Sequence, residues 1–174
     1  MKNTFIVLNQ MQADGVIGPY AIGGAVGATF YLEPVATMDV DVFVFLAASH
    51  SGPLLTLGPI YDYLLPRGHR ADGEYVVIGD WPVQFLPPAG PLEEEAITEA
   101  ASHNLEGVPI RVMTAEHLVA IALKTGRAKD YARILLFIEA GVLDTARLDA
   151  ILARHSLLDK WEQFGKRFLS GDKP

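Results

Sequence analysis

Cysteine is absent from the 174-residue chain, and this absence removes several kinds of site at once. Without thiols the protein has no disulfide framework, no zinc–thiolate centre and no cysteine nucleophile. The five histidines also lack the short spacing that places two metal ligands on one helix. Basic residues are few, since 14 Lys and Arg face 21 Asp and Glu for a formal net charge of −7. A surface of this sign repels phosphate backbones, so we predict no non-specific binding of nucleic acid.

Long apolar runs are missing as well. The N-terminal apolar stretch is interrupted by Asn9 and Gln10, unlike a secretory signal, and no other run is long enough for a bilayer. We therefore expect a cytoplasmic protein without membrane association. The remaining composition is 50% hydrophobic and 20% charged, which excludes disorder and suffices for a substantial core.

The order of apolar and polar residues predicts an α+β fold. In the first two thirds of the chain, short apolar strands alternate with helical patterns and Gly/Pro turns. The expected elements there are helices at 2–13, 25–32 and 53–66, strands at 20–22, 39–46, 75–78, 83–86 and 108–113, and a helix that opens at Glu93. From Thr114 onward the pattern is entirely helical. We expect a mixed β-sheet flanked by helices in residues 1–113, with a helical C-terminal region, 114–174, packed on this core as one structural unit.

The most regular strand begins at an acidic residue and alternates in character. Val40, Val42 and Val44 lie on one face, while Asp39 and Asp41 lie on the other. The alternation predicts a strand with one buried face and one face that carries two carboxylates.

Two adjacent glycines, Gly23 and Gly24, precede this acidic strand by one helix-sized segment. A Gly-Gly turn between a strand and a helix lets backbone N–H groups approach a phosphate at the helix N-terminus. The Cα atoms of Asp39 and Asp41 lie about 6.7 Å apart along a strand, and such close carboxylates repel unless a cation such as Mg²⁺ lies between them. Alone, an Asp-x-Asp is most often a surface pair and a Gly-Gly a plain turn. Together they predict metal-assisted phosphoryl or nucleotidyl transfer.

Two blocks of sequence carry a resemblance to a known family. Ala21-Ile-Gly-Gly-Ala25 followed by Thr37-Met-Asp-Val-Asp-Val-Phe-Val44 resembles the signature of the DNA-polymerase-beta-like nucleotidyltransferase superfamily. The block from Glu116 to Arg133 is similar to the helical Lys…Arg-x-Lys-Asp motif of AbiEii-type and related small bacterial nucleotidyltransferases, some of which are toxins of toxin–antitoxin pairs. The two blocks together span most of the chain, and the resemblance implies a nucleotidyltransferase-like mixed sheet.

The first block implies a metal and nucleotide site. By the resemblance, Asp39 and Asp41 are metal ligands for Mg²⁺ or Mn²⁺ and act in catalysis. Gly23 and Gly24 would lie against the triphosphate of an NTP, and Thr37 matches the family's residue just before the acids.

The second block implies phosphate contacts from the helical region. By the resemblance, Lys124, Arg127 and Lys129 neutralise phosphate charge, and Asp130 either orients them or serves as a catalytic base. Five of the 14 cations fall within residues 111–133, where only two acids oppose them, so the segment is locally +3. The plainer interpretation is a solvated helix face, as for most runs of Lys and Arg.

One position departs from the family pattern. Active members carry a third carboxylate on a later strand, and the matching position here holds Gln84. A neutral amide is a poor base and a weak metal ligand. Either Asp130 or a water carries the deprotonation, or the protein binds nucleotide without efficient turnover. We predict a metal-dependent nucleotidyltransferase, with a catalytically degenerate nucleotide-binding or interaction module as the alternative.

The acceptor of the nucleotidyl group stays open at this stage. A protein side chain, a tRNA end or a small molecule each offers a hydroxyl, although the acidic charge makes tRNA the weaker candidate. Minimal transferases of this type often depend on a partner protein, so a toxin–antitoxin role follows by family analogy alone.

Overall fold

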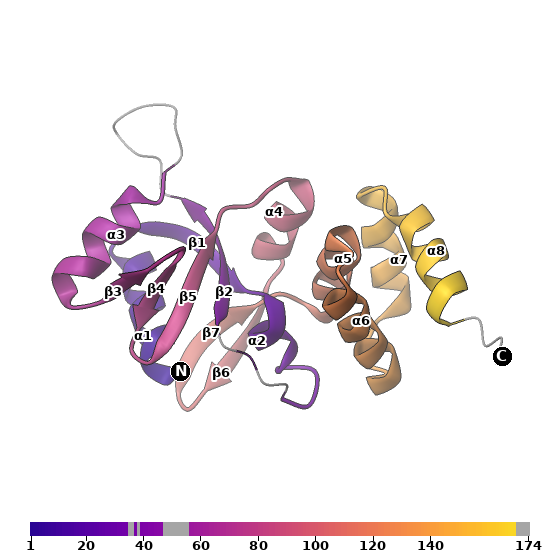
Figure 1. Ribbon diagram of the computed structural model, residues 1–174, viewed down its shortest axis with the longest axis horizontal. Helices are drawn as coiled ribbons and strands as arrows, with labels where there is room; N and C mark the ends of the chain where they lie inside the picture. The colour runs from indigo at the N-terminus through magenta and orange to yellow at the C-terminus, as the bar shows by residue number, and fades with distance from the viewer. Residues whose placement is uncertain (35–36, 38, 47–55, 170–174) are drawn as a thin grey trace. The chain divides into compact units, whose positions relative to one another are not determined.

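The computed structural model describes residues 1–34, 37, 39–46 and 56–169. The chain divides into two compact units, Met1–Thr114 (unit 1) and Ala115–Pro174 (unit 2). Within the described residues, unit 1 holds every strand and unit 2 is helical (Figure 1). The predicted α+β class with a helical C-terminal third is confirmed.

Seven strands of unit 1 form one mixed sheet in the order β3-β4-β5-β2-β1-β7-β6. The strands are β1 (Ile17–Ile22), β2 (Val40–Leu46), β3 (Arg70–Asp72), β4 (Tyr75–Ile78), β5 (Trp81–Leu86), β6 (Ala101–Leu105) and β7 (Val108–Val112). The pairs β2/β5 and β1/β7 are parallel, and the other neighbours are antiparallel. The acidic strand β2 therefore lies in the middle of the sheet.

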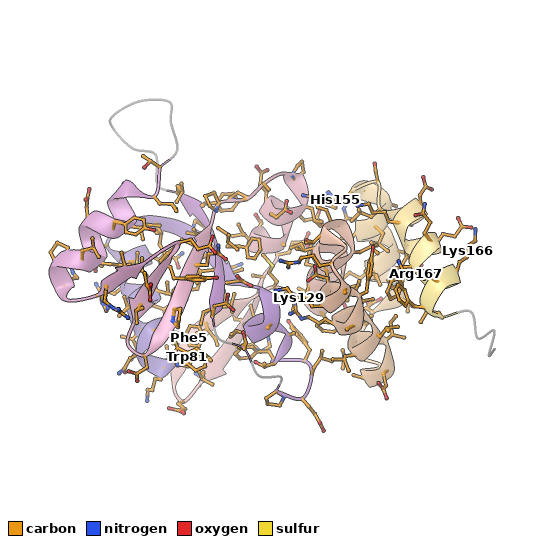
Figure 2. All side chains as sticks on the ribbon, in the orientation of Figure 1. Phe5, Trp81, Lys129, His155, Lys166 and Arg167 are labelled. Atoms are coloured by element: carbon orange, nitrogen blue, oxygen red, sulfur yellow. The ribbon has the colours of Figure 1, made fainter. Side chains whose placement is uncertain are left out.

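The helices of unit 1 are α1 (Lys2–Ala13), α2 (Gly24–Ala28), α3 (Gly58–Leu64) with the 3₁₀ turn η1 (Leu65–Arg67), and α4 (Pro91–Thr98). Helix α1 presents Phe5, Leu8 and Met11 at helical spacing, and all three are fully buried in the core against the sheet. Trp81 of β5 packs against this core, and Figure 2 labels both Trp81 and Phe5. Burial of these apolar side chains is the main favourable term that holds α1 on the sheet.

Arg111 of β7 fixes the end of α4. Its Nη2 donates to the carbonyl oxygens of Ile97, Thr98 and Ala100, at 3.0–3.2 Å. The last carbonyls of a helix have no partners within the helix, so a guanidinium that binds the Ile97 and Thr98 carbonyls, together with that of Ala100 just beyond α4, stabilises the helix end.

Unit 2 contains four helices among its described residues: α5 (Ala115–Thr125), α6 (Ala128–Ala140), α7 (Thr145–Arg154) and α8 (Leu158–Phe168). Gly141 ends α6 in the left-handed region at φ 64°, and Asp144 begins α7 by accepting a hydrogen bond from the Arg147 amide at 3.0 Å. Tyr131, Phe164 and Phe168 meet with ring centroids 5.0–5.7 Å apart and join α6 to α8.

Several predicted boundaries were wrong. The helix expected at 25–32 spans only Gly24–Ala28, and the helix expected at 53–66 runs over Gly58–Leu64, with residues 53–55 outside the described part. Strands β3 and β6 were missed because most of their residues are polar and none is fully buried. Among the helices that the structure describes, none combines the length and apolar composition of a bilayer span.

Candidate functional site

The glycine pair lies where β1 passes into α2, beside the acidic strand. The Gly23 amide donates to the Asp41 carbonyl at 3.0 Å and so continues the β1–β2 pairing past Ile22, which is opposite Val42. Gly24 then adopts φ 56°, in the left-handed region that side chains rarely occupy. The chain thus turns sharply at Gly24, directly next to Asp41.

Side chains of β2 approach both glycines closely. A Cβ at Gly24 would lie 1.8 Å from Asp41 Oδ2, so the carboxylate occupies the space that any side chain would need. A Cβ at Gly23 would lie 2.6 Å from Cε2 of Phe43. The Gly-Gly pair therefore lets the turn approach a carboxylate, which is a more specific role than chain reversal. Because α2 has only five residues, the turn is a small backbone cradle without a long helix behind it.

Asp39 is held by hydroxyl groups from two other places in unit 1. Thr37 Oγ1 lies 3.3 Å from Asp39 Oδ1 and 3.2 Å from its carbonyl oxygen, while the Tyr75 hydroxyl donates to Oδ2 at 3.4 Å. Burial, together with the negative charges of Glu74 and Asp39, raises the pKa of the Tyr75 phenol above its usual value. The phenol is thus protonated at neutral pH and able to donate.

Gln84 lies directly beside Asp41. The parallel pairing of β2 with β5 puts the two residues in register, as Val40 is with Val83, so their side chains leave the same face of the sheet. The antiparallel pairing of Val76 with Val83, continued by one residue, brings Tyr75 opposite Gln84 on that face. A row across three neighbouring strands therefore reads tyrosine, glutamine and aspartate.

Positive charge is scarce in unit 1, which has 4 Lys and Arg against 13 Asp and Glu, or a net −9. Three of its four cations are engaged elsewhere. The Arg67 guanidinium lies 3.6 Å from the ring centroid of Tyr63, Arg70 lies 3.7 Å from Asp72, and Arg111 caps α4. Charge in this unit therefore favours a cation as the ligand of the Asp39 and Asp41 carboxylates.

The predicted basic residues belong to unit 2, which has 10 Lys and Arg against 8 Asp and Glu, or a net +2. Lys124 is in the last turn of α5, and Lys129 is in the first turn of α6 (Figure 2). Both side chains are exposed, as is that of Arg127. The Lys124 carbonyl accepts a hydrogen bond from Lys160 Nζ of α8 at 3.1 Å.

Asp130 is buried and already occupied. Its side chain is 2% exposed and accepts from Arg127 Nε at 2.7 Å, Arg127 Nη2 at 3.2 Å and the Arg127 amide at 3.2 Å. These bonds begin α6 and hold the guanidinium, whose own side chain is 59% exposed, in one orientation. Of the two roles predicted for Asp130, orienting the cation fits these contacts better than acting as a base.

The structure therefore places five predicted site residues together in unit 1. The other four, Lys124, Arg127, Lys129 and Asp130, belong to unit 2. The first group is Gly23, Gly24, Thr37, Asp39 and Asp41. Sequence reasoning missed Tyr75 as the partner of Asp39. The available signal was its position at the start of β4, on the same face as Gln84.

Comparison with known proteins identifies the fold. No known family model matches the chain, and no curated protein matches it. Solved structures with a similar fold include the following three. ANT(2″)-Ia in complex with adenylyl-2″-tobramycin has a TM-score of 0.53 at 14% identity over 92% of this chain and 99% of that one. The solution structure of the antibiotic-resistance factor ANT(2″)-Ia has 0.53 at 17% over 93% and 97%.

The third structure is an antigenic nucleotidyltransferase-like protein from Paracoccidioides brasiliensis, with a TM-score of 0.58 at 16% identity over 95% of this chain and 91% of that one. At such identities the likeness shows the fold. The protein has a nucleotidyltransferase fold, as the sequence predicted. The likeness covers nearly the whole chain, so it includes both units.

Proposed function

We propose that the protein transfers a nucleoside monophosphate from an NTP to an acceptor hydroxyl, with a divalent cation held by Asp39 and Asp41. The observation that carries the proposal is the contact between the glycine turn and the acidic strand. The Asp41 carboxylate fills the space that a side chain at Gly24 would take. The glycine turn proposed to bind phosphate and the carboxylate proposed to bind the cation are therefore adjacent.

The donor set fits Mg²⁺ or Mn²⁺. Carboxylate oxygens are the ligands that these hard cations prefer, and the cysteine-free, unit-1 site offers no soft ligand. The hydroxyls of Thr37 and Tyr75 restrain Asp39 without adding charge, as groups around a metal ligand commonly do. When bound, such a cation neutralises phosphate charge and orients the triphosphate.

The other predicted residues would contact the nucleotide. The backbone at Gly23 and Gly24 can approach phosphate oxygens because no side chain covers it. Lys124, Arg127 and Lys129 would neutralise phosphate charge, and Asp130 would keep the Arg127 fork oriented for bidentate contact. An exposed cation cluster in a protein of net −7 is consistent with a polyanionic ligand.

The reaction is a displacement at the α-phosphorus. The acceptor oxygen forms the new P–O bond, the bond to the β-phosphate breaks, and pyrophosphate leaves with that electron pair. The acceptor proton must go to a base or to water. Gln84 can accept a hydrogen bond from the acceptor hydroxyl but cannot take up its proton at neutral pH. We therefore expect slow turnover. The rate should rise with pH, because the fraction of deprotonated acceptor and the concentration of hydroxide both increase.

The charge of unit 1 favours a small cationic acceptor. Unit 1 has a net charge of −9, which attracts cations and repels a folded nucleic acid. ANT(2″)-Ia has been solved with adenylyl-2″-tobramycin, a small molecule that carries an adenylyl group. Among the three acceptors considered from sequence, a small molecule with positive charge fits best.

A second function has one observation in its favour. Gln84, in register with Asp41, leaves the site without a third carboxylate. A catalytically degenerate module that binds nucleotide and does not turn it over would have this composition. The two proposals differ in one outcome: the transferase moves the nucleoside monophosphate to an acceptor, whereas the degenerate module leaves the bound NTP unchanged.

The deciding experiment incubates the protein with each α-labelled NTP, Mg²⁺ or Mn²⁺ and a panel of hydroxylated amines, a protein extract and total tRNA. The Asp39→Asn/Asp41→Asn variant serves as the metal-site control, and Asp62→Asn of α3 as a control for charge. The proposal is supported if the wild type transfers label to a hydroxylated amine and the double variant does not. Tight NTP binding without transfer to any acceptor supports the degenerate module. Transfer that survives the double substitution contradicts the metal assignment.

The resemblance to AbiEii-type proteins adds a proposal about physiology. A toxin–antitoxin pair, with a partner protein and a cytoplasmic location, predicts that expression of the chain alone arrests growth. Arrest that disappears in the Asp39→Asn/Asp41→Asn variant would support that role. Equal growth with both chains would contradict it.

A further inference from the structure

Helix α8 of unit 2 has apolar side chains that the core does not bury. Phe164 faces the core and is buried, whereas Leu158 is 47% exposed and Phe168 is 36% exposed. One side of the helix carries a stripe of residues at intervals of three, four and three: Leu158, Trp161, Gly165 and Phe168. This spacing is that of the a and d positions of a coiled coil, so the α8 stripe has the form of a surface that packs against another helix.

Gly165 is the unusual member of the α8 stripe. Glycine is disfavoured inside a helix, and close packing against a neighbour is the common reason to find one there. At Gly165, however, no atom that the structure describes lies within 4 Å of the position that a Cβ would take. Packing inside the described chain therefore does not call for a glycine at this position. A missing side chain on an exposed helix lets a second chain approach closely.

The α8 stripe fits a second copy of itself when the two helices run antiparallel. A two-fold axis at residue 163 puts Trp161 of each copy opposite Gly165 of the other, and Leu158 opposite Phe168. The large indole then fills the space above the glycine. A parallel pair would instead put Trp161 beside Trp161 and Gly165 beside Gly165, which crowds one layer and leaves a gap in the next.

The charges beside the α8 stripe also fit a second copy. Glu162 and Lys166 form an ion pair along one flank of the stripe, and both side chains are exposed. In the antiparallel pair, Glu162 of each copy lies near Lys166 of the other, so the flank holds two charges of each sign. Unit 2 has a net charge of +2 against −9 for unit 1, so two copies repel each other less through unit 2.

We propose that two copies of this chain associate through antiparallel α8 helices, with Trp161 of each copy packed over Gly165 of the other. The surface belongs to unit 2 alone and is independent of the proposed transfer reaction. Because α8 has 11 residues, the helix pair buries a small area. The dimer is therefore weak and reversible, with a Kd on the order of 10 µM.

Sedimentation equilibrium of the full-length protein, at concentrations on both sides of this Kd, measures the association. Gly165→Gln places a long side chain where Trp161 of the other copy would pack, and the dimer should weaken at least tenfold. The monomer should not suffer, because a Cβ at Gly165 meets open space and glutamine is the better helix former. Thermal melting of the dilute protein should therefore be unchanged or higher in this variant.

A charge exchange gives a second test that does not change the glycine. Glu162→Lys and Lys166→Glu should each weaken the dimer, since either one leaves four like charges on the flank. The double variant Glu162→Lys/Lys166→Glu should restore the dimer. Gln163→Lys, on the opposite side of α8, adds the same kind of charge away from the stripe and should match the wild type.

The absence of native cysteine allows the helix direction to be tested. Mild oxidation of a mixture of Leu158→Cys and Leu169→Cys proteins should give mainly mixed disulfides if the helices are antiparallel. A predominance of disulfides between two Leu158→Cys chains would overturn the antiparallel pairing. A wild type that stays monomeric at the highest concentration, or a dimer that folded Gly165→Gln leaves intact, would overturn the proposal as a whole.

Discussion

The two faces of strand β2 differ in burial and in chemical character. One face consists of Val40, Val42 and Val44, all fully buried in the core. The other carries Asp41 and Phe43, which are half buried and adjoin the glycine turn. A strand of seven residues thus belongs to the core on one side and to the candidate site on the other.

This difference teaches how a small fold separates stability from chemistry. Apolar burial is the dominant favourable term in folding and is roughly proportional to the area removed from water, so the valine face stabilises the sheet. The acidic face does the opposite in the absence of a cation, since Asp39 and Asp41 repel each other. Substitutions on the two faces should therefore change different measurements.

The largest effect is expected on the acidic face. Asp41→Asn removes one of the two charges that would bind the cation, and transfer should fall about a thousandfold. The free energy of unfolding should stay the same or rise slightly, because carboxylate repulsion is relieved. Labelled-NTP transfer and a urea unfolding curve check the two parts, with Asp62→Asn as control. A variant that loses stability while keeping transfer would reverse the assignment of the faces.

The glycine turn should show the next largest effect. Gly24→Ala places a Cβ 1.8 Å from Asp41 Oδ2 and requires an L side chain at φ 56°. The backbone strain alone costs about 1–2 kcal/mol, and displacement of Asp41 should weaken Mn²⁺ binding at least tenfold.

Gly73 offers a matched control for this substitution. It has φ 61°, but no atom lies within 4 Å of the position that a Cβ would take, so Gly73→Ala carries the strain without the collision. Gly24→Ala should lose at least as much stability as Gly73→Ala in urea unfolding, and only Gly24→Ala should lose Mn²⁺ affinity. Equal affinity in the two variants would mean that the contact with Asp41 does not matter for the site.

The valine face should respond in stability alone. Val42→Ala deletes two buried methyl groups and leaves a cavity in the core, which costs about 2 kcal/mol of unfolding free energy. Transfer by the folded protein, measured well below the melting temperature, should stay within twofold of the wild type. A larger loss of transfer would show that the core face positions the acids on the opposite side.

The contrast between the faces could be predicted from sequence because it depends on local alternation. A period of two predicted a strand at 39–46 with its valines on one face; the structure confirms the alternation from Val40 to Leu46, and the strand begins one residue later than predicted, after Asp39. Helix α1 could be predicted from sequence in the same way, since Phe5, Leu8 and Met11 fall on one helical face.

The features that local periodicity could not supply depend on register between distant strands. The alignment of Gln84 with Asp41 joins residues 43 positions apart, and only the family resemblance pointed to Gln84; the Tyr75 contact with Asp39 spans 36 positions and was missed. Their positions are set by pairing across the sheet, which leaves no periodic trace in the chain. The short strands β3 and β6 were missed for a related reason: tertiary pairing, not residue preference, makes Arg70–Asp72 and Ala101–Leu105 extended.

Asp130 of unit 2 tests the comparison outside the sheet. This buried acid forms an ion pair with Arg127 that holds the start of α6, so we expect it to act mainly in stability, unlike Asp39 and Asp41. Asp130→Asn should cost about 1 kcal/mol in unfolding free energy and reduce NTP affinity less than tenfold, because the amide keeps part of the helix cap. Turnover at saturating NTP checks the alternative role, since loss of a catalytic base would lower it a hundredfold or more.

The smallest effect is expected at the edge of the acidic face. Tyr75→Phe removes the hydroxyl that donates to Asp39 Oδ2, and the length of that bond, 3.4 Å, limits its contribution. Mn²⁺ should bind about two- to fivefold more weakly, corresponding to roughly 0.5–1 kcal/mol, with unchanged unfolding free energy. Tyr61→Phe, which removes a hydroxyl from α3, is the control. A loss above tenfold would make Tyr75 a ligand in its own right, whereas no change would mean that Thr37 alone holds Asp39 on the acidic face.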